Sequence, residues 1–259
     1  MMPSARTHRF RLILAGVDFS RESAQALRYA VATARSAGGR VVVVHAIDPL
    51  LSAAVVRAYG ERALAEDARG DLERFIRRAV GAEAAPAIAC AIVEGPARQV
   101  LIAEARRRHA DLVVVGTTGR GGLSKTFFGS TTEALLRRYD GAVMVVPPRC
   151  GRPPAGWPGG SMAAAIPAGP HRRAMLSAAA RTAAVFGGGL TVVEPPAGGA
   201  RARWQPAPLV LLPMARAARL QMFRQGSAAY ALVRRAAVPV VVLHTGRRVG
   251  HPELHRPAA

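Results

Sequence analysis

A glycine-rich segment between an apolar run and a helix-like run constrains the fold of this chain more than any other feature. The apolar run is Leu112–Val115, the glycine-rich segment spans 116–131, and the helix-like run is 133–138. A buried strand, a glycine-rich loop and a helix start frame a phosphate site, because glycine lets backbone N–H groups approach oxyanions and a helix N-terminus adds unpaired donors. The loop also holds the only lysine of the chain, Lys125. The segment predicts an anion site at the end of a strand.

The first half of the chain alternates between strand and helix patterns. Five short apolar runs predict strands at 11–17, 41–47, 87–93, 111–115 and 142–146. Helical patterns separate them, at about 24–36 with Ser20 as cap, at 54–80, and from Gly95-Pro96 to about 108. Repeated β-α-β units predict a doubly wound, parallel five-stranded sheet. Ligands of such sheets bind where strand order reverses, so Asp18 and Gly116, which follow the first and fourth strands, can meet across one crevice.

The second half reads as a shortened, degenerate copy of the first. A Pro/Gly-rich linker over 149–165 precedes a reduced domain at 166–246 and a flexible tail at 247–259. Pro213, Arg216 and Gly226-Ser227 follow Gly116, Gly119 and Gly129-Ser130 at a constant offset of 97 residues. The segment 188–193 echoes 38–43 at an offset of 150. The difference of 53 residues corresponds to the long helix, the third strand and the helix after it.

The amino-acid composition indicates which partners and which cellular compartment to expect. The formal net charge is +20, which invites a nucleic-acid interpretation, but the arginines are scattered and replace lysine almost throughout, without interleaved aromatic residues. Nucleic acid is therefore not the expected partner. Cys90 and Cys150 are the only cysteines and lack metal-ligand spacing, which fits a reducing compartment. No apolar run is long enough to cross a bilayer and the N-terminus lacks a secretory pattern, so we expect a cytoplasmic protein without membrane contact.

The motifs together resemble a known family. A Gly-x2-Gly-x9-Gly-Ser/Thr pattern after a fourth strand, with Val17-Asp18-Phe-Ser20 after the first, is similar to the ATP-binding class of universal stress proteins (UspA-like). The strand end Val44-His45-Ala46, Gly95-Pro96 and the Val143–Pro147 finish agree with it. The resemblance covers residues 8–148 in full and 166–246 in shortened form, as a tandem two-domain chain. It implies a Rossmann-like fold of the adenine nucleotide alpha hydrolase type.

The resemblance also implies a set of binding residues. Asp18 would lie by the adenine and ribose, and the Ala46 backbone would contact the adenine edge. The residues implied to line the ribose and triphosphate are Gly116, Gly119, Arg120, Gly129, Ser130 and Thr131. The cofactor implied is ATP, with or without Mg²⁺, and no catalytic or metal-ligating residue is assigned. Two purely structural alternatives stay open: Asp18 is a helix-capping residue only, and the glycines form ordinary turns.

The second copy departs from this pattern. Pro213 and Arg216 replace the first two glycines, and Ala168 stands where the offset of 150 places Asp18. Proline lacks an N–H, and arginine does not readily adopt the backbone angles open to glycine. We therefore expect that copy not to bind nucleotide. The resemblance implies that the copies pair internally through Val143–Val146 and Val240–Leu243, and a homodimer stays open.

The expected function is that of a stress-response protein that binds an adenine nucleotide as an occupancy signal. There is no nucleophile–base constellation and no Gly-Lys-Ser/Thr ending of a P-loop, so little or no hydrolysis is expected and the chain is not classed as an enzyme. Two alternatives stay open. One is a nucleotide-independent basic scaffold that docks an acidic protein or nucleic acid, and the other is a weak ATPase or phosphotransfer protein.

Overall fold

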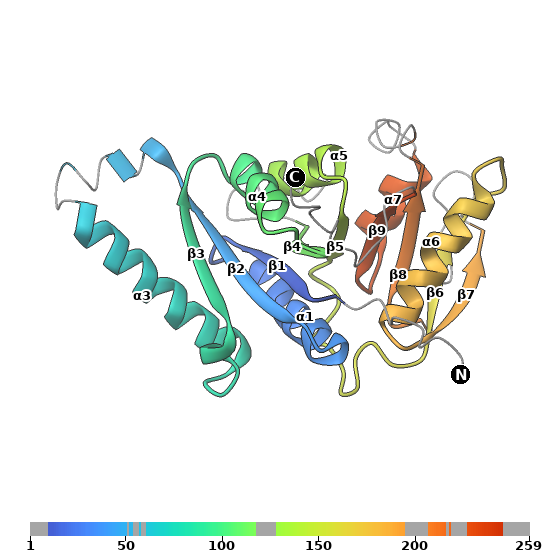
Figure 1. Ribbon diagram of the computed structural model, residues 1–259, viewed down its shortest axis with the longest axis horizontal. Helices are drawn as coiled ribbons and strands as arrows, with labels where there is room; N and C mark the ends of the chain where they lie inside the picture. Colours follow the sequence, from blue (N-terminus) through green and yellow to red (C-terminus); the bar gives the residue numbers. More distant parts are fainter. Residues whose placement is uncertain are drawn as a thin grey trace, which may run out of the picture.

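Nine strands form one continuous sheet in the order β3-β2-β1-β4-β5-β9-β8-β6-β7 (Figure 1). The computed structural model describes residues 10–50, 52–53, 57, 61–117, 128–194, 207–215, 218 and 227–245. The strands are β1 (Leu12–Val17), β2 (Arg40–Ile47), β3 (Ala89–Glu94), β4 (Leu112–Gly116), β5 (Ala142–Val146), β6 (Ser161–Ala165), β7 (Gly189–Val193), β8 (Val210–Met214) and β9 (Val240–His244). The fourth and fifth strands in sequence thus lie near the middle of the sheet.

The first five strands are all parallel, and their order reverses between β1 and β4. The helices of this half are α1 (Arg21–Ala37), α3 (Glu61–Val80), α4 (Ala97–Arg107) and α5 (Ser130–Arg138), with a 3-10 turn at Ala85–Ala87. Buried residues of α1 and α3 pack on one face of the sheet, and those of α4 and α5 pack on the other. The predicted doubly wound sheet is therefore confirmed.

The second half repeats part of this arrangement. Its strands lie in the order β9-β8-β6-β7, which matches β5-β4-β1-β2 in the first half. Two helices accompany them, α6 (Arg172–Val185) on the α1 face and α7 (Ala228–Arg235) on the α5 face. In the part of the chain that the structure describes, no strand corresponds to β3. This absence agrees with the shortfall of 53 residues between the two copies.

The position of β6 differs from the predicted boundary between the linker and the second domain. Residues 149–165 were expected to be a linker, but Ser161–Ala165 form a strand that pairs with β7 and β8. Alanine has a low β-propensity, so Ser161-Met-Ala-Ala-Ala165 does not look like a strand in isolation. Burial between two neighbouring strands decides its conformation instead, since Met162–Ala165 are all buried.

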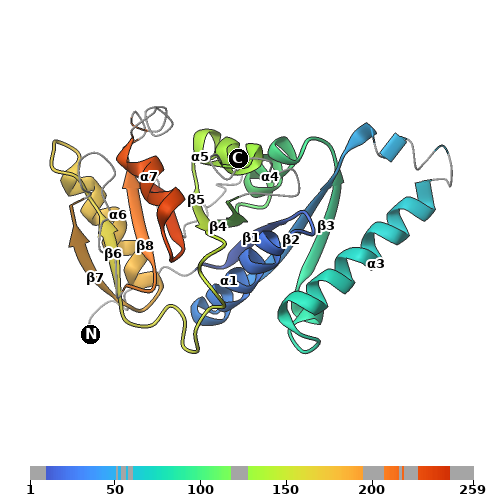
Figure 2. The ribbon, with the colours of Figure 1, turned by 180° about the vertical axis from the view of Figure 1, so that it is seen from behind.

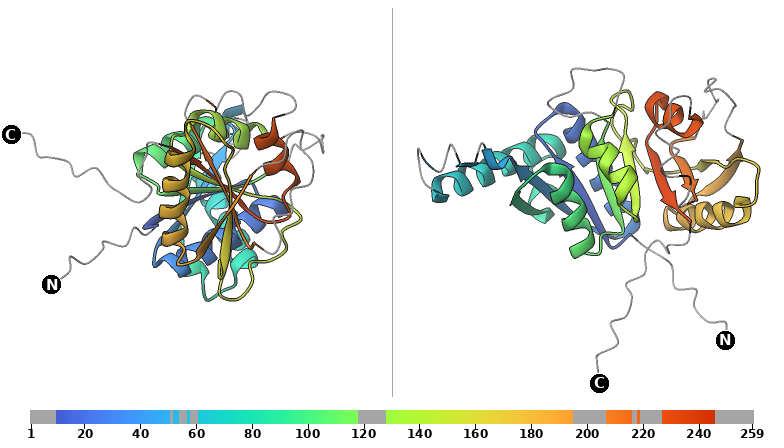
Figure 3. Two further views of the ribbon diagram at one scale, coloured as in Figure 1. Left: turned by 90° about the vertical axis from the view of Figure 1, so that its right-hand side faces the viewer. Right: turned by 90° about the horizontal axis from the view of Figure 1, so that it is seen from above.

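The two halves are joined by the antiparallel pair β5–β9, in which Val143, Met144 and Val145 lie opposite Val242, Val241 and Val240. These are the strands for which the sequence analysis expected internal pairing. All five residues of β5 are buried. Figure 3 shows both halves along the shared sheet, seen from its end and from above.

Further contacts between the halves lie on the α1 face. The segment after β5 crosses α1 on its way to β6 (Figure 2), and its Trp157 is only 5% exposed. The Trp157 indole N–H donates to the Thr33 hydroxyl at 3.2 Å, and its ring lies against Tyr29 with ring centroids 4.8 Å apart. Phe10 and Phe186 make a second aromatic contact across the halves at 5.1 Å. None of the described helices is both long and apolar enough to cross a bilayer.

Candidate functional site

The carboxyl ends of β1, β2 and β4 meet at the point where the strand order reverses. Val17, the last residue of β1, pairs with His45 of β2, and β1 also pairs with β4. Asp18 directly follows β1, Ala46 lies near the end of β2 and Gly116 ends β4. The structure therefore brings these three predicted site residues to one edge of the sheet. This edge is where open α/β sheets bind ligands.

Asp18 is fixed by hydrogen bonds at the start of α1. Its Oδ1 accepts from the Ser20 backbone N–H at 3.1 Å and from the Ser20 hydroxyl. The Ser20 side chain in turn accepts from the Ser23 N–H at 3.0 Å, which makes Ser20 the helix cap as predicted. Asp18 thus supports the helix cap through Ser20, as the capping alternative predicted. A carboxylate has about four acceptor positions, so two bonds from Ser20 do not use up its capacity.

Phe19 is a site feature that the sequence analysis missed. Its φ of 62° lies in the left-handed region, which is unfavourable for a bulky residue. The Phe19 ring lies 4.5 Å from the His45 ring and 5.4 Å from Phe75 of α3, so it bridges the ends of β1 and β2. Left-handed backbone at such residues is concentrated at functional sites. The only sequence signal was an aromatic residue between Asp18 and Ser20.

The backbone of Ala46 faces the end of β1. The carbonyl of the next residue, Ile47, accepts from the Gly95 N–H at 2.9 Å, on the β3 side of the strand. Backbone groups of successive strand residues point to opposite edges, so the C=O of Ala46 points to the β1 side. There the ladder between β1 and β2 has ended at the pair Val17–His45. His45 is structural, because its Nδ1 lies 2.8 Å from the Val17 carbonyl and must carry the proton to donate.

Gly116 allows a close approach between β4 and the first turn of α1. A Cβ at this position would lie 3.0 Å from Glu22 Cβ and 3.2 Å from the Glu22 carbonyl carbon, so a larger residue would push the two elements apart. The Gly116 carbonyl accepts from the Thr132 hydroxyl at 2.8 Å. The Gly129 N–H donates to the Thr117 carbonyl, also at 2.8 Å. These two bonds hold the start of α5 against the end of β4.

The N-terminus of α5 has the features of an anion site. Its cap residue is Gly129, which has no side chain to satisfy the first N–H groups of the helix. Ser130 is exposed and Thr131 is half-buried, while Thr132 is buried and faces β4. Helix N-termini carry a partial positive charge, so the N–H groups and hydroxyls here suit phosphate oxygens.

The equivalent helix of the second half differs at this point. In α7 the cap is Ser227, and its side chain accepts from the Tyr230 N–H. Ser227 corresponds to Ser130 at the offset of 97. The serine therefore satisfies its own helix in the second half, whereas in the first half it lies one position inside the helix. Pro213 ends up within β8, paired with Leu243.

The remaining predicted residues cannot be placed. Gly119, Arg120 and Lys125 belong to 118–127, which lies outside the described residues. Asp18, Ala46, Gly116, Gly129, Ser130 and Thr131 are described.

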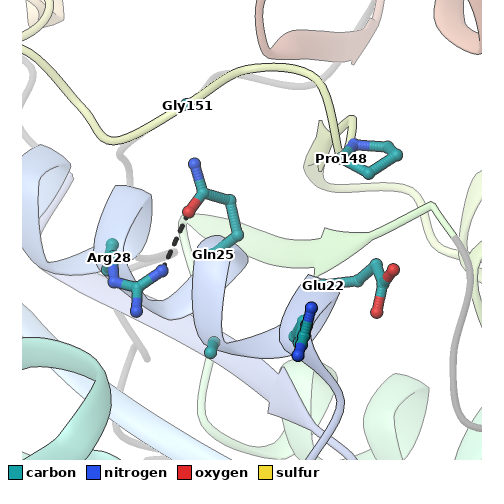
Figure 4. A pocket seen from close by; sticks show the side chains of 7 residues that line it. Glu22, Gln25, Arg28, Pro148 and Gly151 are labelled. Atoms are coloured by element: carbon teal, nitrogen blue, oxygen red, sulfur yellow. Dashed lines mark hydrogen bonds between the residues drawn. The ribbon is translucent and has the colours of Figure 1, made fainter.

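An open hollow of about 460 Å³ lies along α1 and begins at the first turn of this helix (Figure 4). It is lined by Arg21, Glu22, Ala24, Gln25, Arg28, Pro148 and Gly151. Arg28 donates to the Ala79 carbonyl at 2.9 Å and to Gln25 Oε1 at 3.0 Å. Burial, and secondarily the charge of Arg152, lower the Arg28 pKa. The lining includes neither Asp18 nor any residue of α5, but it includes Glu22, which lies against Gly116, so the hollow adjoins the candidate site.

The cysteines lie away from the site and are both free thiols. Burial raises the pKa of the Cys150 thiol to about 12. The pKa of Cys90 is also raised, chiefly by burial. Both groups are therefore neutral thiols with weak nucleophilicity near pH 7. Within the described residues, no group of three His, Cys, Asp or Glu side chains could hold a metal ion.

The fold and this edge define a doubly wound α/β protein in which a helix capped by glycine begins near the switch point of the sheet. The model of the universal stress protein family matches residues 9–147, and the chain belongs to that family. A universal stress protein of Thermus aquaticus is 29% identical over 140 residues, which are 53% of this chain and 98% of that protein. One from Mycolicibacterium smegmatis is 30% identical over 140 residues, 52% of this chain and 47% of the relative.

A solved structure extends the likeness in fold to both halves. The crystal structure of a universal stress protein from Archaeoglobus fulgidus superposes with a TM-score of 0.63 and 17% identity. The match covers 92% of this chain and 98% of the other. The arrangement of a full half and a second, related half is therefore that of a known fold.

Proposed function

We propose that the N-terminal half binds ATP, or another adenine nucleotide, and that occupancy of this site is the signal that the protein carries in a stress response. The observation that supports this most is the convergence of Asp18, the Ala46 carbonyl and the N-terminus of α5, whose cap is Gly129, at one sheet edge. The carboxylate would accept from a ribose hydroxyl and the Ala46 backbone would contact the adenine edge. The Gly129–Thr131 turn would hold phosphate oxygens.

The same residues support binding more than turnover. Asp18 is engaged with Ser20 in a capping network, and the histidine at this edge, His45, is engaged with the Val17 carbonyl. A positioned general base is what phosphoryl transfer to water requires. We therefore propose little or no hydrolysis. Free thiols at both cysteines agree with action in a reducing compartment such as the cytoplasm.

We propose a single nucleotide site per chain. The second half keeps a helix start at Ser227, but this serine caps its own helix and a proline stands where Gly116 ends β4. That half also lacks, among the described residues, a strand equivalent to β3, the neighbour that holds the end of β2 through Ile47 and Gly95. It would act as a structural partner through β9.

Titration calorimetry tests the proposal. Purified protein should bind ATP with a stoichiometry near one, and protein purified without added nucleotide, then denatured, should release an adenine nucleotide. Gly129→Val should abolish binding. It should leave the fold intact, because the φ of −60° and ψ of 147° at Gly129 are accessible to valine. Gly226→Val, the matched change in the second half, should leave the affinity unchanged.

Three results would contradict this proposal. They are no binding at micromolar protein, a stoichiometry near two, and equal affinity in Gly129→Val and wild type. Phosphate release that survives both Asp18→Ala and Gly129→Val would come from elsewhere. Steeply salt-dependent binding of an acidic partner, without any rise in stability on adding ATP, would favour the basic scaffold.

A further inference from the structure

We infer that Tyr230 of the second half is a positioning residue for the nucleotide site of the first half. The inference rests on the proposed function, because the site in question is the N-terminus of α5. It assigns the reduced copy a specific part in binding rather than only a place in the sheet.

The first step is a direct contact. Phe128 immediately precedes Gly129, the cap of α5. It is a buried residue, with only 7% of its surface exposed. The ring of Tyr230, in the first turn of α7, meets the Phe128 ring edge-on with centroids 4.9 Å apart and an interplanar angle of 74°. Such geometry is the favourable one for aromatic pairs. The contact joins a residue next to the proposed phosphate turn to the other half of the chain.

The second step is what Phe128 adjoins. Only Gly129 separates it from Ser130, and the peptide between Phe128 and Gly129 carries the N–H that bonds to the Thr117 carbonyl. This bond sets the distance between the end of β4 and the start of α5. Movement of the Phe128 ring therefore shifts the N–H groups that the proposed site presents to phosphate. Positioning errors well below 1 Å weaken such sites.

The third step concerns the second copy. At the offset of 97, Tyr230 stands where the first copy has Glu133, which pairs with Arg137 on the surface of α5. The aromatic residue is thus particular to the reduced copy. Its own helix is secured by the Ser227 cap and by Leu232 and Val233, which are buried against the sheet. A well-anchored helix presents Tyr230 to Phe128 as a firm support.

A second aromatic contact between the halves supplies the control. Phe10 and Phe186 meet edge-on at 5.1 Å, but they belong to the core on the opposite face of the sheet from Phe128. Tyr230→Leu and Phe186→Leu each replace one ring of a contact across the halves with a smaller apolar side chain. Tyr230→Phe keeps the ring and removes only the hydroxyl.

The test measures ATP affinity by calorimetry and, without nucleotide, hydrogen exchange of the backbone amides at 129–133. We expect Tyr230→Leu to lower the affinity about 3- to 10-fold, the size of one aromatic pair, and to speed exchange at these amides. Tyr230→Phe and Phe186→Leu should stay within about twofold of wild type in affinity, because an aromatic pair near the site is kept in both.

Unchanged affinity in Tyr230→Leu, or an equal loss in Phe186→Leu, would overturn the assignment. The exchange measurement separates this inference from the proposed function. If wild-type protein binds no adenine nucleotide, the proposed function fails, and the exchange rates alone decide whether Tyr230 holds the start of α5. Equal exchange in Tyr230→Leu and wild type would then reject the inference.

Discussion

The contact between Gly116 and the first turn of α1 gives a prediction whose sign can be tested against a matched glycine. In Gly116→Ala the new Cβ would lie 3.0 Å from Glu22 Cβ and 3.2 Å from the Glu22 carbonyl carbon. Carbon atoms at rest lie about 3.5–4.0 Å apart, so α1 or the end of β4 must shift by several tenths of an ångström. Over-packing of this kind costs about 1–3 kcal/mol.

Gly70 is the matched position, because the same substitution there has the opposite sign. It lies inside α3, where an added Cβ meets only the guanidinium of Arg74, the end of a flexible side chain. Alanine is favoured over glycine inside a helix by about 0.5–1 kcal/mol. Urea denaturation should therefore show Gly116→Ala less stable than wild type and Gly70→Ala more stable.

Of these two substitutions, only Gly116→Ala should change the affinity for nucleotide. The first turn of α1 is capped by Ser20, which also holds Asp18, so moving this turn in Gly116→Ala displaces the carboxylate. We expect an affinity for ATP lower by about tenfold, or about 1.4 kcal/mol, and no change in Gly70→Ala. Wild-type stability and affinity in Gly116→Ala, or a destabilised Gly70→Ala, would refute the geometric reasoning.

Two further predictions concern stability. Trp157→Ala should lower the free energy of unfolding by about 3–5 kcal/mol, because the Trp157 ring is buried against Tyr29. Trp157→Phe should lower it by about 1–3 kcal/mol, because the hydrogen bond to the Thr33 hydroxyl is lost. Urea denaturation measures both changes. Hydrogen bonds from Arg107, together with Arg108, lower the Glu104 pKa to about 2 from 4.5, so the stability that this carboxylate adds is present above about pH 4.5 and is lost as pH falls towards 2. Glu104→Gln should therefore be less stable than wild type at pH 7 and should approach it in acid; a constant difference across that range would contradict the assignment.

Local patterns were sufficient to predict much of this fold. The apolar runs placed all five strands of the first half within about two residues, because parallel strands buried on both faces leave little else that such runs can form. The Ser20 cap and the left-handed Gly38 that ends α1, with a φ of 65°, follow from side-chain and backbone chemistry within a few residues. For the same reason the sequence pointed to Asp18, Gly116 and the α5 start as one edge.

What the sequence could not show depends on contacts between distant segments. Phe19 adopts a left-handed backbone because its ring is held by His45 and Phe75, which lie far along the chain. Trp157 sits in a segment rich in proline and glycine that reads as a linker, yet it is buried on α1. The strand β6 is alanine-rich and acquires its conformation from β7 and β8. In each case tertiary packing overrides a weak local preference.

The presence of the second half can be explained by the need to cover the edge of β5, independently of nucleotide binding. The five residues Ala142–Val146 are apolar and buried, and within the first half β5 has a neighbouring strand, β4, on one side only. An uncharged edge strand of this kind pairs readily with other chains, so it needs a permanent neighbour. β9 supplies that neighbour within the same chain, and β8, β6 and the helices α6 and α7 bury the apolar faces of β9. The segment equivalent to β3 has no part in covering β5. Selection for a covered edge would therefore preserve β6 to β9 whether or not the second copy binds nucleotide.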